Sequence, residues 1–177
     1  MPAKAFTLSF IKREQIAENT YSFFFKKGGF IFLPGQYIRM VLPHDPADDR
    51  GTSRYFTISS SPLDEFLIIT AKVIKSTFKN ELLKLSEGAQ VTMFGPLGTF
   101  VLRDDEKDQL VFLSGGMGIT PFHSMIKYAA DKKMSVPITL IASFSSPEDM
   151  IFYDEMMQIN QESENIKIVY MNKRISE

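Results

Sequence analysis

The sequence predicts an all-β barrel or sandwich followed by an α/β domain with a parallel sheet. Three observations predict this order. Residues 1–104 hold short strand-like segments separated by Gly and Pro turns, the pattern of an all-β domain. Residues 105–177 alternate apolar strands with helical segments, the pattern of crossover helices joining parallel strands. The charged segment Asp104-Asp105-Glu106-Lys107-Asp108 separates the two patterns and marks the expected domain boundary.

In the first domain, alternation of apolar and polar residues predicts the strands. Phe6, Leu8 and Phe10 alternate with polar neighbours, as expected of a strand with one buried face. The expected strands are residues 6–10, 21–25, 37–42, 53–59, 66–74 and 90–94. One helix is expected at residues 78–85, because apolar residues recur there at helical spacing after the candidate N-caps Ser76 and Thr77.

The second domain follows a βαβαβ order. Its expected strands are residues 110–113, 138–143 and 166–170, and its expected helices are residues 121–132 and 148–160. This is half of a dinucleotide-binding sheet, whose full strand order is 3-2-1-4-5-6. We therefore expect an incomplete form of a longer protein, or one that relies on a partner. The apolar strand 110–113 would keep an unpaired edge, which favours self-association.

Composition excludes several classes of function. The 177 residues carry 20 Lys and Arg against 21 Asp and Glu, and no basic cluster indicates nucleic-acid binding. The longest apolar runs are too short for a membrane span, and no signal peptide is evident, so a cytoplasmic protein is expected. Without cysteine, and with only His44 and His123 as imidazoles, no metal site is expected. Any electron carrier must be organic or lie on a partner.

The segment Ser114-Gly115-Gly116-Met117-Gly118-Ile119-Thr120-Pro121 joins a strand to a helix and predicts a dinucleotide phosphate site. Glycine allows the backbone to approach a phosphate, Thr120 can cap the following helix, and Pro121 suits its first turn, so that the free N–H groups face an anion. The alternative is a tight turn that needs glycine for steric reasons alone. The segment departs from G-x-G-x-x-G, and Ser143-Phe144-Ser145 stands where an acid usually follows the second strand.

Arg54-Tyr55-Phe56-Thr57 predicts a second site, for a cofactor that is part phosphate and part aromatic plane. The guanidinium matches phosphate oxygens with two parallel hydrogen bonds, and the rings offer stacking surfaces. An ordinary strand with an extended Arg side chain is the alternative. The helix start at Ser76-Thr77 is a further candidate for phosphate, or a plain N-cap. Two phosphate-binding elements favour a cofactor with two phosphates over a cofactor with one.

Together these features resemble the ferredoxin–NADP reductase-like flavoprotein family over essentially the whole chain. Members have a six-stranded antiparallel FAD-binding barrel followed by a nucleotide-binding α/β domain, here truncated. The matching stretches are Pro34-Gly35-Gln36-Tyr37, Arg54-Tyr55-Phe56-Thr57, Ser76-Thr77-Phe78-Lys79, Gly95-Pro96-Leu97-Gly98 and Gly115-Gly116-Met117-Gly118-Ile119-Thr120-Pro121. The family's later Cys-Gly-Pro segment and C-terminal aromatic residue are absent.

The resemblance implies a role for each matched residue. Arg54 would hold the FAD pyrophosphate, Phe56 would pack on the isoalloxazine where the family usually has Tyr, and Thr57 would bond near its N5. Further contacts to the flavin are implied for Tyr55, Ala71, Lys72, Val73, Ser76 and Thr77. Contacts to NAD(P)H are implied for Gly115, Gly116, Gly118 and Thr120. Phe56, Thr57 and Thr120 would then form the catalytic set, acting by stacking and positioning.

We therefore expect a flavin-dependent oxidoreductase that passes electrons between NAD(P)H and an acceptor through FAD. The expected acceptor is a small iron–sulfur or haem protein. The alternatives are an FAD-binding electron-transfer subunit that does not use nicotinamide, and a non-catalytic binding module. Lys173 and Arg174 follow the third strand of the second domain and slightly favour NADPH, by pairing with its 2′-phosphate, unless they are solvated tail residues.

Overall fold

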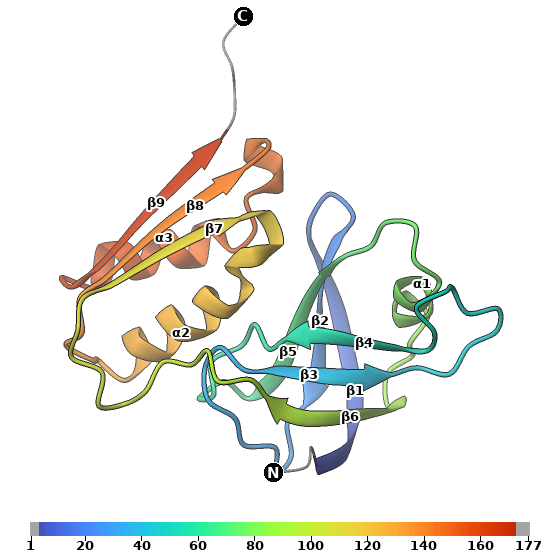
Figure 1. The fold of residues 1–177 in the computed structure, drawn as a ribbon. Coiled ribbons are helices and arrows are strands. Elements are labelled where there is room, and N and C mark those ends of the chain that lie inside the picture. Colours follow the sequence, from blue (N-terminus) through green and yellow to red (C-terminus); the bar gives the residue numbers. More distant parts are fainter. Residues whose placement is uncertain (1–3, 173–177) are drawn as a thin grey trace, which may run out of the picture.

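A computed structural model describes residues 4–172 as two sheets with their helices (Figure 1). The first part contains β1 (Lys4–Ala17), β2 (Thr20–Lys26), β3 (Tyr37–Val41), β4 (Ser53–Thr57), β5 (Phe66–Lys72), α1 (Thr77–Leu83) and β6 (Gln90–Leu97). The second part contains β7 (Leu110–Gly115), the 3-10 turn η1 (Gly116–Ile119), α2 (Thr120–Asp131), β8 (Ile138–Phe144), the 3-10 turn η2 (Pro147–Asp149), α3 (Tyr153–Glu162) and β9 (Ile166–Asn172). This confirms the predicted fold class.

The first sheet is antiparallel and curls into a barrel. Its strand order is β4-β3-β6-β1-β2-β5, so β4 and β5 are the two edges. A single bridge between Ile58 and Ile69 joins these edges, just beyond the end of β4. The alternating strands send their apolar residues inward, and Phe10, Phe23 and Phe25 are fully buried there. The seam between β4 and β5 is therefore the least paired part of the barrel.

The second sheet is parallel, with strand order β7-β8-β9. Figure 1 shows α2 and α3 on the same face of this sheet. Phe112, Leu140 and Ile168 point to the helices and are buried. On the opposite face, Val111 is 59% exposed and Leu113 is 69% exposed. Within residues 4–172, β7 and β9 each pair only with β8, so one face and both edges of the sheet stay open.

The helix starts of the second domain differ from the sequence prediction. The helix predicted at residues 148–160 is wrong at its start, because residues 147–149 form η2 and α3 begins at Tyr153. Phe152 has φ 61°, a left-handed conformation that no residue inside a right-handed helix adopts. The prediction that Thr120 caps α2 is also wrong. Thr120 lies inside the helical segment that η1 begins, and its hydroxyl donates to the carbonyl of Met117.

Two matched motifs of the barrel pack on each other and on the second domain. The Gln36 side chain accepts from the Leu33 N–H at 2.8 Å and donates to the Gly98 carbonyl at 3.1 Å. Gly35 has φ +99°, and a Cβ there would overlap the Phe100 carbonyl and the end of Met125. These contacts give Gly35 and Gln36 a structural role. The buried residue Leu102 already belongs to the second core, and the exact domain boundary stays a prediction.

Helix α2 is tied to the barrel directly after β4. His123 Nδ1 donates to the Ser59 carbonyl at 2.7 Å, and Ser124 Oγ donates to the Ser60 carbonyl at 2.6 Å. Glu155 of α3 holds the other ring nitrogen of His123 at 2.8 Å. This set of contacts, here named the interdomain clasp, fixes the segment after Thr57 against the helix that begins at Thr120.

Within residues 4–172, the longest helices are too short and too polar to cross a membrane. The cytoplasmic location expected from the sequence stays a prediction.

Candidate functional site

The main candidate site is a cavity of about 290 Å³ at the seam between β4 and β5. Both edge strands contribute to it, and the start of α2 closes it from the second domain. It is lined by Arg50, Arg54, Tyr55, Phe56, Thr57, Thr70, Ala71, Lys72, Lys79, Met117 and Thr120. The structure thus brings the four residues of the Arg54 motif together with Ala71 and Lys72, which the resemblance assigned to the same cofactor. Thr120, which the resemblance assigned to the nicotinamide nucleotide, lines the same cavity.

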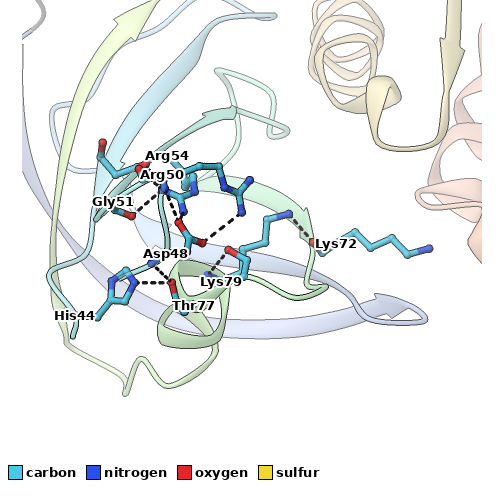
Figure 2. Close-up of polar contacts among 10 residues, drawn as sticks. His44, Asp48, Arg50, Gly51, Arg54, Lys72, Thr77 and Lys79 are labelled. Carbon is cyan, nitrogen blue, oxygen red and sulfur yellow. Dashed lines mark hydrogen bonds and ion pairs between the residues drawn. The ribbon is translucent and has the colours of Figure 1, made fainter. Parts of the chain in front are cut away.

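Arg54 is the most tightly held side chain of this cavity. Its Nη1 donates to the carbonyls of Arg50 and Gly51 at 2.8 Å and of Ser53 at 2.7 Å. Its Nη2 donates to Asp48 Oδ1 (Figure 2). The side chain is 10% exposed, yet its Nε is buried and has no hydrogen-bond partner. A buried N–H without an acceptor is costly, so this atom indicates a binding partner of opposite charge.

Two further cations make the cavity strongly positive. Arg50 and Lys79 line it beside Arg54, and Asp48 pairs with the two arginines. Lys72, which also lines the cavity, pairs with Asp149. Burial, with the charges of Arg50 and Arg54, lowers the pKa of Lys79. Desolvation opposes the charged form of Asp48, but hydrogen bonds from Arg54 and Arg50 outweigh it and lower the pKa of Asp48. Three cations against one carboxylate suit a ligand that carries more than one negative charge.

The start of α1 is engaged by the protein's own loop. Ser76 is the N-cap, and its hydroxyl accepts from the Lys79 N–H at 3.4 Å. Thr77 Oγ1 lies 3.0 Å from His44 Nε2 and accepts from the Asp48 N–H at 3.0 Å (Figure 2). Ser76, Thr77 and Val73 do not line the cavity. The structure therefore places the two hydroxyls behind the Asp48 loop, as supports of the site.

The two aromatic rings of the motif face different surroundings. Phe56 is 8% exposed and packs 5.9 Å from the ring of Phe78 in the barrel core. Tyr55 is 65% exposed and meets Tyr37 edge-on at 5.8 Å. Tyr55 therefore has the larger free surface for stacking, although both rings border the cavity.

A second cavity, of about 280 Å³, lies beside the first at the carboxyl ends of the parallel strands. It is lined by Thr20, Lys72, Gly115, Gly116, Met117, Ser143, Phe144, Ser145, Asp149 and Ile151. Met117 and Lys72 border both cavities, so ligands in the two would be neighbours. Lys72 Nζ crosses from the barrel to Asp149 Oδ1 at 2.9 Å. Figure 2 shows this side chain extending away from the Arg54–Asp48 pair.

The glycine segment differs in detail from the sequence prediction. Gly116–Ile119 form a 3-10 turn that continues into α2, so the helical N–H groups begin at the glycines and not at Thr120. Gly115 and Gly116 border the second cavity, whereas Gly118 does not. Ser143-Phe144-Ser145 borders the same cavity, and η2 brings the carboxylate of Asp149 to it from further along the chain. Lys173 and Arg174 lie outside the described residues.

Sequence reasoning missed Asp48, Arg50 and Lys79 as site residues. Lys79 carried a signal, since it belongs to the matched stretch Ser76-Thr77-Phe78-Lys79 and stands one turn into α1. No pattern in the sequence indicated Asp48 and Arg50, because they reach Arg54 only when the loop of residues 44–53 folds over Thr77.

Comparisons with known proteins support both halves of the chain. Residues 112–177 match the family model of the oxidoreductase NAD-binding domain. The chain is 34% identical over 142 residues to the glycine betaine monooxygenase reductase subunit of Pseudomonas aeruginosa, covering 78% of this chain and 38% of the relative. It is 30% identical over 149 residues to the toluate 1,2-dioxygenase electron transfer component of Pseudomonas putida, covering 80% and 42%. The chain thus spans about two fifths of the length of these curated relatives.

Solved structures share the fold at low sequence identity. The ferredoxin–NADP⁺ reductase of Plasmodium falciparum superposes with a TM-score of 0.81 at 19% identity, covering 98% of this chain and 72% of that one. A flavohemoglobin from Malassezia yamatoensis, with bound FAD and heme, superposes with a TM-score of 0.77 at 19% identity, covering 95% and 45%. The barrel and the three-stranded sheet therefore have the same arrangement in these proteins.

Proposed function

The chain belongs to the ferredoxin–NADP reductase-like family of FAD- and NAD-binding flavoprotein reductases, and we propose that it binds FAD and transfers electrons from NAD(P)H to an acceptor. The observation that carries the proposal is the cavity at the β4–β5 seam. It combines a buried guanidinium edge, two further cations and an aromatic ring. A dinucleotide offers a diphosphate to the guanidinium and the cations, and a flat ring system to the aromatic ring.

The residues of the cavity divide between the two ends of such a cofactor. Arg54, Arg50 and Lys79 would hold the diphosphate, and the free Nε of Arg54 would find its acceptor there. Tyr55, Phe56 and Thr57 lie further along β4, where the ring system would follow. Bound FAD would supply the two-electron chemistry that no side chain of this site offers. The chain itself contributes binding, orientation and exclusion of water.

The second cavity is proposed to receive the nicotinamide nucleotide. Its glycines lie at the start of a helical segment, where backbone N–H groups favour phosphate. The interdomain clasp and the shared wall at Met117 would hold the nucleotide against the flavin. A preference for NADPH remains a prediction that depends on Lys173 and Arg174, while Asp149 favours neither nucleotide as long as Lys72 neutralises it.

Flavin spectroscopy tests the proposal directly. The protein purified with its flavin is denatured, and chromatography of the released cofactor should show FAD and not FMN. The folded protein is then mixed anaerobically with NADH or NADPH, and loss of the flavin absorbance is followed by stopped flow. Rapid bleaching by either nucleotide supports the reductase, whereas FAD that neither nucleotide bleaches supports an electron-transfer subunit without nicotinamide chemistry. Absence of any flavin binding contradicts both proposals.

The acceptor is proposed to be an iron–sulfur or haem protein, because the relatives are reductase components of oxygenase systems by their names. A candidate acceptor is supported when its reduction by NAD(P)H requires this protein and follows its concentration. Failure with iron–sulfur and haem proteins alike would contradict this choice of acceptor.

A further inference from the structure

Asp48 occupies half of the anion-binding edge of Arg54. A guanidinium presents Nε and Nη2 side by side on one edge, and this edge can bind two oxygens of one phosphate. Here Nη2 donates to Asp48 Oδ1, while Nε is buried without a partner (Figure 2). The Asp48 carboxylate therefore lies where one phosphate oxygen would bind, and the neighbouring donor, Nε, has no partner.

Arg54 does not need Asp48 to keep its position. Its Nη1 is surrounded by the carbonyls of Arg50, Gly51 and Ser53, which fix the guanidinium from the opposite side. The loop is likewise held by contacts that do not involve this carboxylate, since the Asp48 N–H donates to Thr77 Oγ1 and the Gly51 N–H donates to the Asp48 carbonyl. Removing the carboxylate charge should leave both the arginine and the loop in place.

We propose that Asp48 is an internal anion that competes with the diphosphate of FAD for Arg54 and so sets the affinity for the cofactor. The inference rests on the proposed FAD binding. In the cofactor-free protein, Asp48 neutralises part of the charge of Arg50, Arg54 and Lys79. When the diphosphate binds, it takes both donors of the guanidinium edge, and the Asp48 side chain, which is 24% exposed, turns toward solvent.

Asp48→Asn tests the competition, because it removes the charge and keeps an oxygen that accepts from the Arg50 N–H. The matched control is Asp49→Asn, which removes the same charge at the next, exposed position. FAD is titrated into flavin-free protein of each form and followed by quenching of flavin fluorescence. Thermal unfolding checks that each variant is folded, and Asp48→Ser replaces Asp48→Asn if the latter is not.

The expected result is that Asp48→Asn binds FAD about three- to tenfold more tightly than the parent, the effect of removing one partly exposed ion pair. Asp49→Asn should change the affinity by less than about twofold, since a charge without contact to Arg54 acts only through screened solvent. Weaker binding by Asp48→Asn would overturn the proposal and make Asp48 a residue that positions Arg54. Equal tightening by both variants would also overturn it, because net charge alone would then explain the gain.

A parallel titration with inorganic pyrophosphate, followed by calorimetry, separates this proposal from the proposed function. Tighter pyrophosphate binding by Asp48→Asn supports the competition even if FAD does not bind any form. In that case the proposed function fails while Asp48 keeps its role at the anion site. Pyrophosphate affinity that is unchanged or weaker in Asp48→Asn contradicts the competition, whatever FAD does.

Discussion

Arg54 shows how a single side chain can serve both the apo fold and a ligand. Three backbone carbonyls surround one end of its guanidinium, while Nε on the other edge is buried without a hydrogen-bond partner. The strand thereby presents a rigid donor pair, and little side-chain entropy remains to be lost on binding. The residues that follow Arg54 on β4 are positioned together with it.

Arg54→Ala should weaken FAD binding by about one to two decades, because charge-assisted hydrogen bonds of roughly 1.5–3 kcal/mol are lost. The dissociation constant is measured by fluorescence quenching. Arg39→Ala is the matched control, since Arg39 lies on β3 and packs on the ring of Phe94 outside the cavity. Equal losses in the two variants would show that the effect is on the barrel and not on the site.

Lys79 predicts a pH dependence of FAD affinity. Its pKa lies below the ordinary 10.5, chiefly because of burial and then because of the charges of Arg50 and Arg54. The ammonium group is therefore lost at lower pH than in a free lysine, and FAD should bind up to about tenfold more weakly as the pH rises toward 10. Lys79→Arg keeps its charge in this range and should abolish the loss. A parallel decline in both proteins would assign the pH dependence to another group.

At the scale of elements, the interdomain clasp is held by an ion pair. The hydrogen bond to His123 lowers the pKa of Glu155 to about 2, against an ordinary 4.5, and Lys127 stands 3.5 Å from the other carboxylate oxygen. A carboxyl group whose pKa is lower in the folded state contributes stability above pH 4.5. That contribution is lost as the pH falls through the range from 4.5 to about 2.

Glu155→Gln should therefore lower the melting temperature at neutral pH and flatten its decline between pH 4.5 and about 2. The effect should be small, since the Glu155 side chain is 45% exposed and solvent screens it. Glu164→Gln, at an exposed position after α3, is the control and should follow the parent curve. If Glu155→Gln also follows the parent curve, the pair does not stabilise the fold.

The order of strands and helices could be predicted from the sequence, because local patterns of apolar and polar residues determine it. Alternation in β1 and the apolar run of β7 identify strands without knowledge of their neighbours. The left-handed backbone of Phe152 could not be predicted from the sequence. It coincides with stacking of the Phe152 ring on the His123 ring, with centroids 3.9 Å apart, which is a contact between distant segments. Such tertiary contacts override local helical preference.

The candidate site shows the same limit. Arg54 and Thr57 were predicted because they share one strand with fixed spacing. Asp48 and Asp149 were not, because contacts between distant segments determine their places. The Asp48 N–H donates to Thr77, and Asp149 of η2 pairs with Lys72 of the barrel. The place of a charged loop residue cannot be predicted from its spacing in the sequence.

At the scale of the molecule, the open face of the second sheet is the main exposed apolar surface of the α/β part. Val111 and Leu113 carry it, and they stand on the edge strand β7. An apolar strand edge without a partner invites pairing with another chain.

The 177-residue chain should accordingly self-associate as its concentration rises, as measured by light scattering. Leu113→Lys should shift this association to higher concentration, because a charge on an edge strand opposes pairing. Leu63→Lys, at a 55% exposed site on the barrel, is the control and should not. A parent chain that stays monomeric at high concentration would contradict the prediction.

The barrel seam has a consequence for backbone motion. In the part of the chain that the structure describes, the contact of β4 with β5 is limited to the bridge between Ile58 and Ile69 and the residues beside it. The other amides of these strands that point into the seam have no partner in a strand ladder, and they should exchange their hydrogens with solvent quickly. FAD bound there would shield them, so exchange in Ser53–Thr57 and Phe66–Lys72 should slow on adding the cofactor. Exchange in the central strand β6 should stay the same, and an equal change there would indicate a global effect. In this sense the flavin would complete the barrel wall as a missing strand does, and the fast-exchanging amides of the seam would report cofactor occupancy.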